Sequence, residues 1–332
     1  MKQIVASIAL ALLILCSVQN VSAISFTEKP ELKAFIDNMV KEHHFERGYL
    51  EQLFAHFHPQ KKILCATYVP CESKNWIEYR NYFITPEKVE QGVNYWQKHE
   101  AALNYAEQKY GVPASIIVAI VGVESNYGAF QPKYHALNAL TTLSFFYPER
   151  ADFFRGELVD YLLLSRDLHL DPRSVLSSYS GALGLAQFMP ISYRQWAVSY
   201  KHQGFPDLLH DTDDVVVSVA NFLHFFDWHK DEPIAVKAVV LGEKYPAVIF
   251  NDIEPKHSLE DIAGYNVKAS EKFNNNYKAA LLRFATDDSY EDWIVFHNFV
   301  VLLHYNTHDN YCMVVYQLAE KIKSLHDRSR LP

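Results

Sequence analysis

The chain has 332 residues, of which 49% are hydrophobic, 14% aromatic and 21% charged. This apolar content excludes a disordered or low-complexity protein, because such chains cannot bury enough apolar surface to fold. The 31 Lys and Arg against 39 Asp and Glu give a net charge of −8, which argues against a nucleic-acid-binding protein. With only 11 Gly and 14 Pro, the composition favours a mainly helical fold.

The first residues carry the pattern of an export signal. Lys2 precedes an apolar run over residues 4–16, and the small residues Ser22 and Ala23 follow it. Because the run is shorter than the ~20 residues that span a bilayer, we expect residues 1–23 to be a signal peptide and the mature chain to be exported to the periplasm. Lipidation of Cys16, which would attach the chain to a membrane, is the alternative, but the bulky Leu15 before it argues against acylation.

Three cysteines remain after cleavage of this segment, and an odd number leaves at least one unpaired. Export permits a disulfide, so Cys65 and Cys71, which flank a loop-like stretch, could pair; three free thiols are the alternative. Cys312 lies in an apolar helical pattern and is expected to be buried.

The predicted elements begin with helical apolar spacing over residues 31–57 and a second helix over 87–109. A third helix follows Pro113 and stops before Gly128. It is apolar on nearly every face, so we expect it in the middle of a helical bundle. Further helices are expected at residues 138–143, 150–166, 191–200 and 214–229.

The pattern changes after residue 231. Over residues 232–293, short apolar or β-branched runs alternate with turn-rich segments, which predicts a small β-containing subdomain. A final helix is expected at 309–324. The predicted fold is therefore mainly α, in the α+β class. Its predicted divisions are a signal peptide (1–23), a helical catalytic domain (24–231), the β-containing subdomain (232–293) and a C-terminal segment that returns to the helical domain (294–332).

One carboxylate stands out in the central helix. Glu124 shares a face with Ile117, Ile120 and Val121. An ionised carboxylate among such neighbours is costly, so we expect a pKa raised toward that of a general acid, as in a glycosidase proton donor. The alternative is a helix-end Glu that faces solvent or pairs with an Arg.

A second segment, SYSGALGLAQFMPISY at residues 178–193, adds an amide to an apolar stretch. Gly181 and Gly184 allow the backbone to approach a ligand or another helix closely. The buried amide of Gln187 needs partners, which could be backbone groups or the hydroxyl and N-acetyl groups of a sugar.

GVESNYG followed by this segment resembles the lytic murein transglycosylase B family, a branch of the lysozyme-like enzymes that cleave peptidoglycan. Further motifs follow the family's order between residues 76 and 318, namely WIEYRNYFITP, YGVP, LNALTTLSFFYPERA, SVANFL and NFVVLLHYN. The resemblance implies a lysozyme-like helical core with a small inserted β-containing subdomain near the C-terminus.

The resemblance also implies a mechanism with one carboxylate. Glu124 matches the family's catalytic acid/base, which protonates the glycosidic oxygen between N-acetylmuramic acid and N-acetylglucosamine and then deprotonates the muramoyl 6-hydroxyl, giving a 1,6-anhydro end. The positions that match cleft or sugar-binding residues of the family are Tyr79, Ser178, Gln187, Tyr305, Asn306 and Tyr311.

Two other functions stay open at this point. A hydrolytic muramidase would use the same Glu, and a catalytically silent peptidoglycan-binding or scaffold protein would not need it. The expected partners are peptidoglycan strands and, by the same resemblance, cell-wall synthesis or remodelling proteins.

The sequence departs from the family at the loop that often binds calcium. Residues 199–205 offer Lys201 and His202, whereas calcium needs six to eight oxygen ligands. The histidines at residues 43–44 and 56–58 lack the i, i+4 spacing of a helical metal site. We therefore expect no calcium, no other metal and no cofactor. Glu149 stands where the family has a basic residue, which leaves stem-peptide preference open.

Overall fold

The computed structural model describes residues 26–67, 75–130, 132–202, 204–250, 254–273 and 276–330. It contains two compact units, Met1–His58 and Pro59–Pro332, which divide the chain at a different point from the predicted domains. The domain boundaries stay a prediction. The expected signal peptide and Cys71 lie outside the described residues. In the described part of the chain, no helix combines the length and apolarity that a membrane crossing requires.

The first unit is helical, with a short 3-10 helix η1 (Phe26–Glu28), α1 (Pro30–His43) and α2 (Arg47–Phe54). The single helical stretch expected over residues 31–57 is therefore interrupted. His44 adopts a left-handed conformation, with φ 59°, which ends α1. The core of this unit includes Phe35 and Phe54, whose ring centroids lie 6.1 Å apart.

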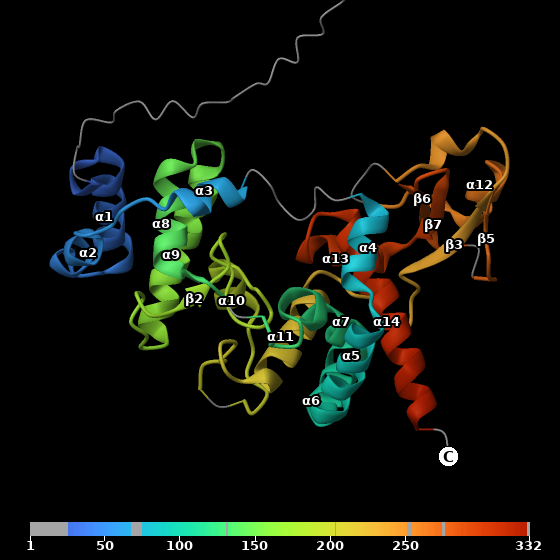
Figure 1. Cartoon of the computed structure of the whole chain (residues 1–332), viewed down its shortest axis with the longest axis horizontal. Helices are drawn as coiled ribbons and strands as arrows, with labels where there is room; N and C mark the ends of the chain where they lie inside the picture. Colours follow the sequence, from blue (N-terminus) through green and yellow to red (C-terminus); the bar gives the residue numbers. More distant parts are fainter. Residues whose placement is uncertain are drawn as a thin grey trace, which may run out of the picture. The chain divides into compact units, whose positions relative to one another are not determined.

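The second unit contains most of the helices (Figure 1). They are α3 (Lys61–Thr67), α4 (Trp76–Phe83), α5 (Pro86–Lys98), α6 (Glu100–Tyr110), α7 (Ala114–Ser125), α8 (Ala136–Phe146), α9 (Ala151–Asp167), α10 (Pro190–Trp196), α11 (Thr212–Phe225), α12 (Leu259–Gly264), α13 (His297–Tyr305) and α14 (Asp309–Ser329), with 3-10 helices η3 (Pro148–Arg150) and η4 (Tyr245–Val248).

The continuous helix predicted over residues 87–109 is wrong. The chain leaves helical geometry at His99, with φ −112° and ψ 24°, and this residue separates α5 from α6. The ring of His99 contacts a distant residue, with Nδ1 3.0 Å from Asp213 Oδ1 at the start of α11. The break therefore lies at a tertiary contact that local spacing does not reveal.

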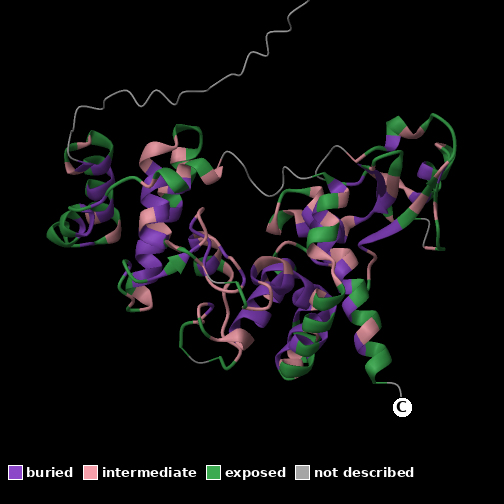
Figure 2. Cartoon of the chain, viewed as in Figure 1, coloured by how far each residue is buried: buried purple, intermediate pink, exposed green. Residues whose placement is uncertain are grey.

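Helix α7 is the central helix that its sequence predicts. Every residue from Ala114 to Gly122 is buried (purple in Figure 2), and α5, α6, α11 and α14 all pack against the helix. A helix that is apolar on all faces can be stable in water only when neighbours cover each face. The end of α7 is thereby fixed within the bundle.

The predicted β-containing region forms an antiparallel five-stranded sheet, with its strands close together in Figure 1. The strands are β3 (Ala235–Val240), β4 (His257–Ser258), β5 (Val267–Ala269), β6 (Lys278–Ala285) and β7 (Tyr290–Val295), in the order β4-β6-β7-β3-β5. Its first and last strands along the chain are neighbours, with Ala235 opposite Val295. The apolar run at residues 247–250 lies outside these strands, in η4 and a bridge from Ile249 to Leu281.

The segment at residues 178–189 follows a two-stranded sheet of β1 (Tyr134–His135) and β2 (Leu176–Ser177). Gly181 and Gly184 have φ values of 88° and 64°. A Cβ added at Gly184 would lie 2.1 Å from the carbonyl oxygen of Leu208, and one at Gly181 would lie 2.4 Å from Leu140 Cδ2. Both glycines therefore allow the chain to pack closely against itself.

Candidate active site

Glu124 lies in the last turn of α7, at a strained helix end. Asn126 and Tyr127 both have positive φ, 50° and 56°. Asparagine adopts this left-handed conformation readily, whereas it costs Tyr127 roughly 1–2 kcal/mol. Ser125 holds the turn that follows. Its Oγ accepts a hydrogen bond from Gly128 N at 3.2 Å, and its carbonyl accepts one from Phe130 N at 2.9 Å.

Two hydrogen bonds with Lys88 of α5 stabilise the same helix end. The Tyr127 hydroxyl donates to the carbonyl of Lys88 at 2.9 Å, and Lys88 Nζ donates to the carbonyl of Gly122 at 2.9 Å. Burial lowers the pKa of Lys88. The sequence motifs did not identify Lys88. The sequence signal for this contact was a pair of glycines within helices, Gly92 and Gly122. A Cβ atom would lie 2.7 Å from the Tyr127 hydroxyl oxygen at Gly92 and 2.6 Å from it at Gly122.

The carboxylate of Glu124 has a partner from the last helix. The Tyr311 hydroxyl donates to Glu124 Oε1 at 2.6 Å, although 187 residues separate them along the chain. Tyr311 is buried. Burial and the nearby charge of Glu124 raise the pKa of Tyr311 well above its usual range. Tyr311 therefore stays protonated and can donate to the carboxylate at any physiological pH.

A second tyrosine connects this pair to the Gln187 segment. The Tyr305 ring is nearly parallel to the ring of Tyr311, at 8° and a centroid distance of 6.3 Å, and its hydroxyl donates to the carbonyl of Ala186 at 2.6 Å. Burial, followed by the charge of Glu124, raises the pKa of Tyr305 as well. The structure thus brings Glu124, Tyr305 and Tyr311 together beside the backbone of residues 186–187.

The polar residues named by the sequence motifs make bonds within the protein. Gln187 has φ 49°, and its Nε2 donates to the carbonyl of Gly184 at 2.8 Å. Ser178 Oγ accepts from the backbone N–H of Ala182 at 3.1 Å, and Asn306 Oδ1 accepts from His308 N at 3.2 Å. These bonds fix each of the three side chains against its own loop.

Tyr79 lies earlier in the chain, in α4. It is only 2% exposed, and its ring lies 4.9 Å from that of Phe83. Among the cysteines, Cys65 is an exposed free thiol and Cys312 a buried one; the predicted pairing partner Cys71 lies outside the described residues.

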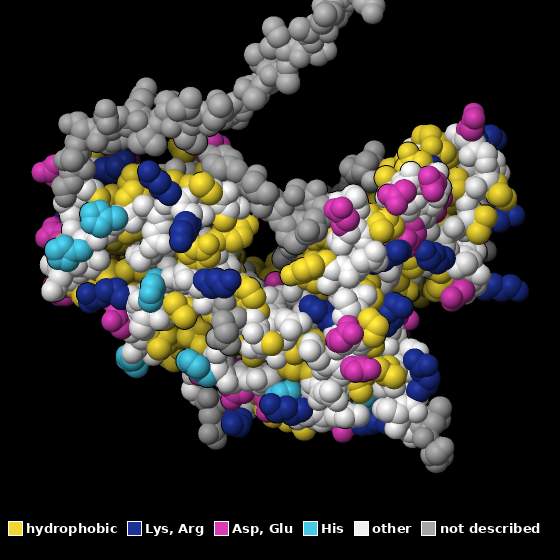
Figure 3. Space-filling view, in the orientation of Figure 1, with side chains coloured by type: hydrophobic (Ala, Val, Ile, Leu, Met, Phe, Trp, Pro, Cys, Tyr) yellow, Lys and Arg dark blue, Asp and Glu magenta, His cyan; other side chains and the backbone are white. Residues whose placement is uncertain are grey.

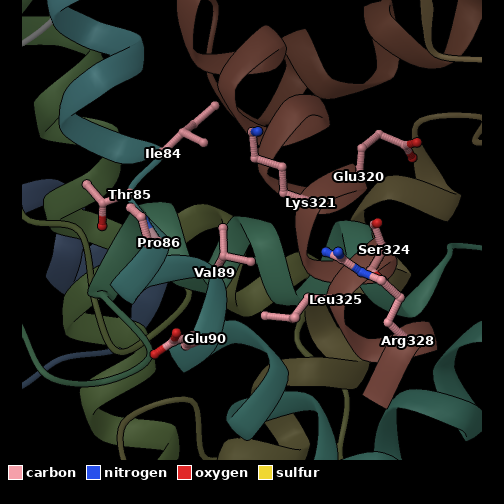
Figure 4. A pocket seen from close by; sticks show the side chains of 10 residues that line it. All are labelled: Ile84, Thr85, Pro86, Val89, Glu90, Glu320, Lys321, Ser324, Leu325 and Arg328. Atoms are coloured by element: carbon pink, nitrogen blue, oxygen red, sulfur yellow. The ribbon is translucent and has the colours of Figure 1, made fainter. Parts of the chain in front are cut away.

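A further groove lies between the start of α5 and α14 (Figure 4), lined by residues such as Pro86, Val89 and Leu325. Its lining contains none of the predicted site residues. On the face drawn in Figure 3, acidic and basic side chains are interspersed, so this view of the described residues shows no extended basic patch.

The comparison with known proteins gives one family. The model of the "Transglycosylase SLT domain" matches residues 27–320. The chain is 36% identical over 307 residues to membrane-bound lytic murein transglycosylase B of Escherichia coli (strain K12), covering 90% of this chain and 84% of that protein.

Solved structures agree. The catenated lytic transglycosylase SltB1 from Pseudomonas aeruginosa superposes with a TM-score of 0.85 at 36% identity, covering 91% of this chain and all of that one. The Escherichia coli lytic transglycosylase Slt35, solved with bulgecin A and also with calcium, gives 0.82 at 37% identity and covers 90% of this chain and 94% of that one. These matches confirm the predicted mainly helical, lysozyme-like fold. The chain therefore belongs to the transglycosylase SLT domain family and is a lytic transglycosylase, an enzyme that cleaves glycosidic bonds of peptidoglycan.

Proposed function

We propose that Glu124 is the single catalytic carboxylate and that it acts first as acid and then as base. The observation that carries this role is the 2.6 Å hydrogen bond from Tyr311 in a buried setting at the end of α7. The bond restricts the direction of the carboxylate. A group positioned in this way can exchange a proton with a sugar oxygen within hydrogen-bond reach.

In the proposed reaction, Glu124 donates its proton to the oxygen between N-acetylmuramic acid and N-acetylglucosamine, and the glycosidic bond breaks. The muramoyl N-acetyl group supports the developing positive charge at C1. Glu124 then takes the proton of the muramoyl 6-hydroxyl as that oxygen bonds to C1, which gives a 1,6-anhydro end. Because the attacking hydroxyl belongs to the same sugar, no second carboxylate is needed to activate water.

The remaining predicted site residues have assisting roles in this proposal. Ser178, Gln187 and Asn306 would position the sugar, and Tyr79, Tyr305 and Tyr311 would line the cleft. Tyrosine suits this role because it offers an apolar ring face and a hydroxyl. The proposal places the enzyme in the periplasm on peptidoglycan strands, on the strength of the signal-like N-terminus.

Substitution of Glu124 by Gln tests the catalytic role. We expect E124Q to lose at least 100-fold of the wild-type rate because Gln has no transferable proton, while binding to insoluble peptidoglycan is retained. The control is E260Q, which changes an exposed Glu on α12 and should keep full activity. Mass spectrometry of the wild-type products should show muramoyl ends lighter by one water than hydrolysed ends.

Other outcomes of these experiments would support the alternative functions or refute the role of Glu124. Products with only reducing muramic acid ends would identify a hydrolytic muramidase. Full activity of E124Q would refute the assignment of Glu124, and wild-type protein that binds peptidoglycan without releasing fragments would indicate a scaffold.

We also propose that the enzyme needs no calcium. The buried carboxylate of Asp214 already accepts two backbone hydrogen bonds beside the loop at residues 199–205, from Tyr200 N at 2.7 Å and Asp207 N at 2.8 Å. Both carboxylate oxygens thus hold the backbone of this loop, and its side chains Lys201 and His202 offer a cation no oxygen ligand. Calorimetric titration with calcium should give no tight binding, and tight binding that is lost on changing Lys201 or His202 would contradict this proposal.

A further inference from the structure

Outside the active site, Asp227, His229 and His297 place three metal-ligating atoms within 4.8 Å of one another. The Nε2 atoms of His229 and His297 lie 3.2 Å and 3.5 Å from the same oxygen, Oδ2 of Asp227. Zinc–ligand bonds of about 2.0–2.1 Å place the ligand atoms of a tetrahedral site about 3.3 Å apart. The separations from both histidines to the carboxylate oxygen match that spacing.

Each histidine also faces a further carboxylate through its other ring nitrogen. His229 Nδ1 lies 3.0 Å from Glu232 Oε2, and His297 Nδ1 lies 3.5 Å from Glu254 Oε2. A histidine that binds a metal commonly donates its other N–H to a carboxylate, which fixes the tautomer and leaves the ligating nitrogen unprotonated. Here that arrangement would leave Nε2 of both rings unprotonated on the side of Asp227.

The backbone that carries these residues is held by separate contacts. Asn298 is fully buried; its Nδ2 donates to the carbonyl of His229 at 2.8 Å, and its Oδ1 accepts from His229 N at 2.9 Å. Asn298 follows His297 directly, so the two histidine segments are fixed against each other. Trp228 N donates to the carbonyl of Leu223 at 3.1 Å and fixes the turn at Asp227.

We propose that Asp227, His229 and His297 bind one zinc ion, with water as the fourth ligand. Two imidazoles and one carboxylate form a known zinc ligand set. His297 Nε2 also lies 2.8 Å from the carbonyl of Asp227, and zinc would replace that contact. No sequence motif indicated this site, because 70 residues separate Asp227 from His297.

The place of this site in the fold gives the ion a structural role. His229 precedes β3, where the chain enters the five-stranded sheet, and His297 follows β7, where the chain leaves it. The two crossings are adjacent, since Phe296 N donates to the carbonyl of Ile234 at 3.0 Å. A bound zinc ion would tie them together and raise the melting temperature, because it binds the folded state alone.

A cluster of protonated histidines and carboxylates is the competing explanation. The two rings stack at a centroid distance of 4.2 Å and 25°. Partial burial opposes protonation of His229, but the hydrogen bonds and charges of Glu232 and Asp227 raise its pKa overall. Such an ion-pair cluster would need no metal.

Calorimetric titration of the metal-free, untagged protein with zinc chloride at pH 7.5 separates the two explanations. We expect one zinc ion per chain, binding weakened at least 100-fold in the double variant H229A/H297A, and binding weakened 10-fold to 100-fold in E232Q. The matched control is H210A, because exposed His210 also pairs with a carboxylate, Asp207, at 3.1 Å. Zinc should raise the melting temperature of wild type and H210A and leave that of the double variant unchanged.

Absence of stoichiometric binding by the wild type would overturn the proposal, and so would equal binding by the wild type and the double variant. If circular dichroism shows that the double variant does not fold, zinc binding by E232Q becomes the test of the proposal. This variant keeps all three ligands, so zinc binding equal to that of the wild type would then refute the site.

Discussion

The hydroxyl of Tyr311 makes the contact that orients Glu124, the proposed catalytic carboxylate. Its hydrogen bond to Glu124 favours the ionised carboxylate and restricts its orientation. We expect Y311F to lower kcat by about 10-fold to 100-fold with little change in KM, because the proton donor loses its alignment and the substrate contacts remain. The alkaline limb of the pH–rate profile should move to higher pH.

The control for this prediction is Y316F on the same helix. Tyr316 is partly buried, with its ring 6.0 Å from that of Trp293, and the substitution removes the same atom. Equal loss of kcat in both variants would show that the effect comes from α14 as a whole and not from the bond to Glu124.

At this scale the sequence indicated candidate residues but not the contacts that hold them. Glu124 was recognisable because a carboxylate ends an apolar helix, and Tyr305 and Tyr311 because they form part of a motif. Lys88 was not, because it acts through two backbone carbonyl groups, and such bonds leave no pattern in the sequence. The proposed zinc site also left no pattern in the sequence, because only tertiary contacts bring its histidines together.

Among the elements, α9 carries a buried carboxylate that holds the start of α10. Glu157 accepts a hydrogen bond from Ile191 N at 3.0 Å, yet burial dominates and raises its pKa to about 7. A raised folded-state pKa means that this carboxyl stabilises the fold fully below its unfolded pKa, near 4.5. That contribution is lost as the pH rises toward 7 and above.

We therefore expect E157Q to remove part of the pH dependence of stability. Gln keeps an acceptor for Ile191 and never ionises. Between pH 5 and pH 8, the free energy of unfolding of the wild type should fall by about 2 kcal/mol more than that of E157Q. Urea unfolding of both proteins at several pH values measures this difference in unfolding free energy. The contributions of the other ionisable groups cancel because both proteins contain them. Parallel curves for the two proteins would contradict the assignment.

Elements with a pronounced pattern were predicted and those set by tertiary contacts were not. The apolarity of α7 on every face predicted its central place, and the β-branched runs predicted β3, β6 and β7. The break at His99 was missed because a contact with Asp213 marks it. Helix α13 was missed because its apolar run directly follows β7, and its spacing alone does not separate a helix from a strand.

For the second unit as a whole, Glu291 joins the sheet to the helices. Its carboxylate accepts from Trp76 Nε1 at 3.0 Å, Arg80 Nη1 at 2.7 Å and Lys237 Nζ at 2.8 Å. Burial opposes ionisation, but the hydrogen bond and charge of Lys237 and the hydrogen bond from Trp76 hold the pKa of Glu291 below its usual value.

We expect E291Q to lower the free energy of unfolding by about 2–4 kcal/mol, because it removes a partly buried charge that satisfies several donors. Exposed Glu90 provides the matched control in E90Q. Thermal unfolding followed by circular dichroism measures both. A change within 0.5 kcal/mol of wild type would show that the network does not hold the sheet in place.

The distance along the chain between Glu124 and Tyr311 also determines when the active site can form. A ribosome releases the chain from its N-terminus, so the carboxylate emerges 187 residues before the hydroxyl that orients it. The sheet and α13 must be synthesised in between. An incomplete chain therefore lacks the contact that orients Glu124, so the proposed active site can assemble only after α14 has been synthesised and has docked.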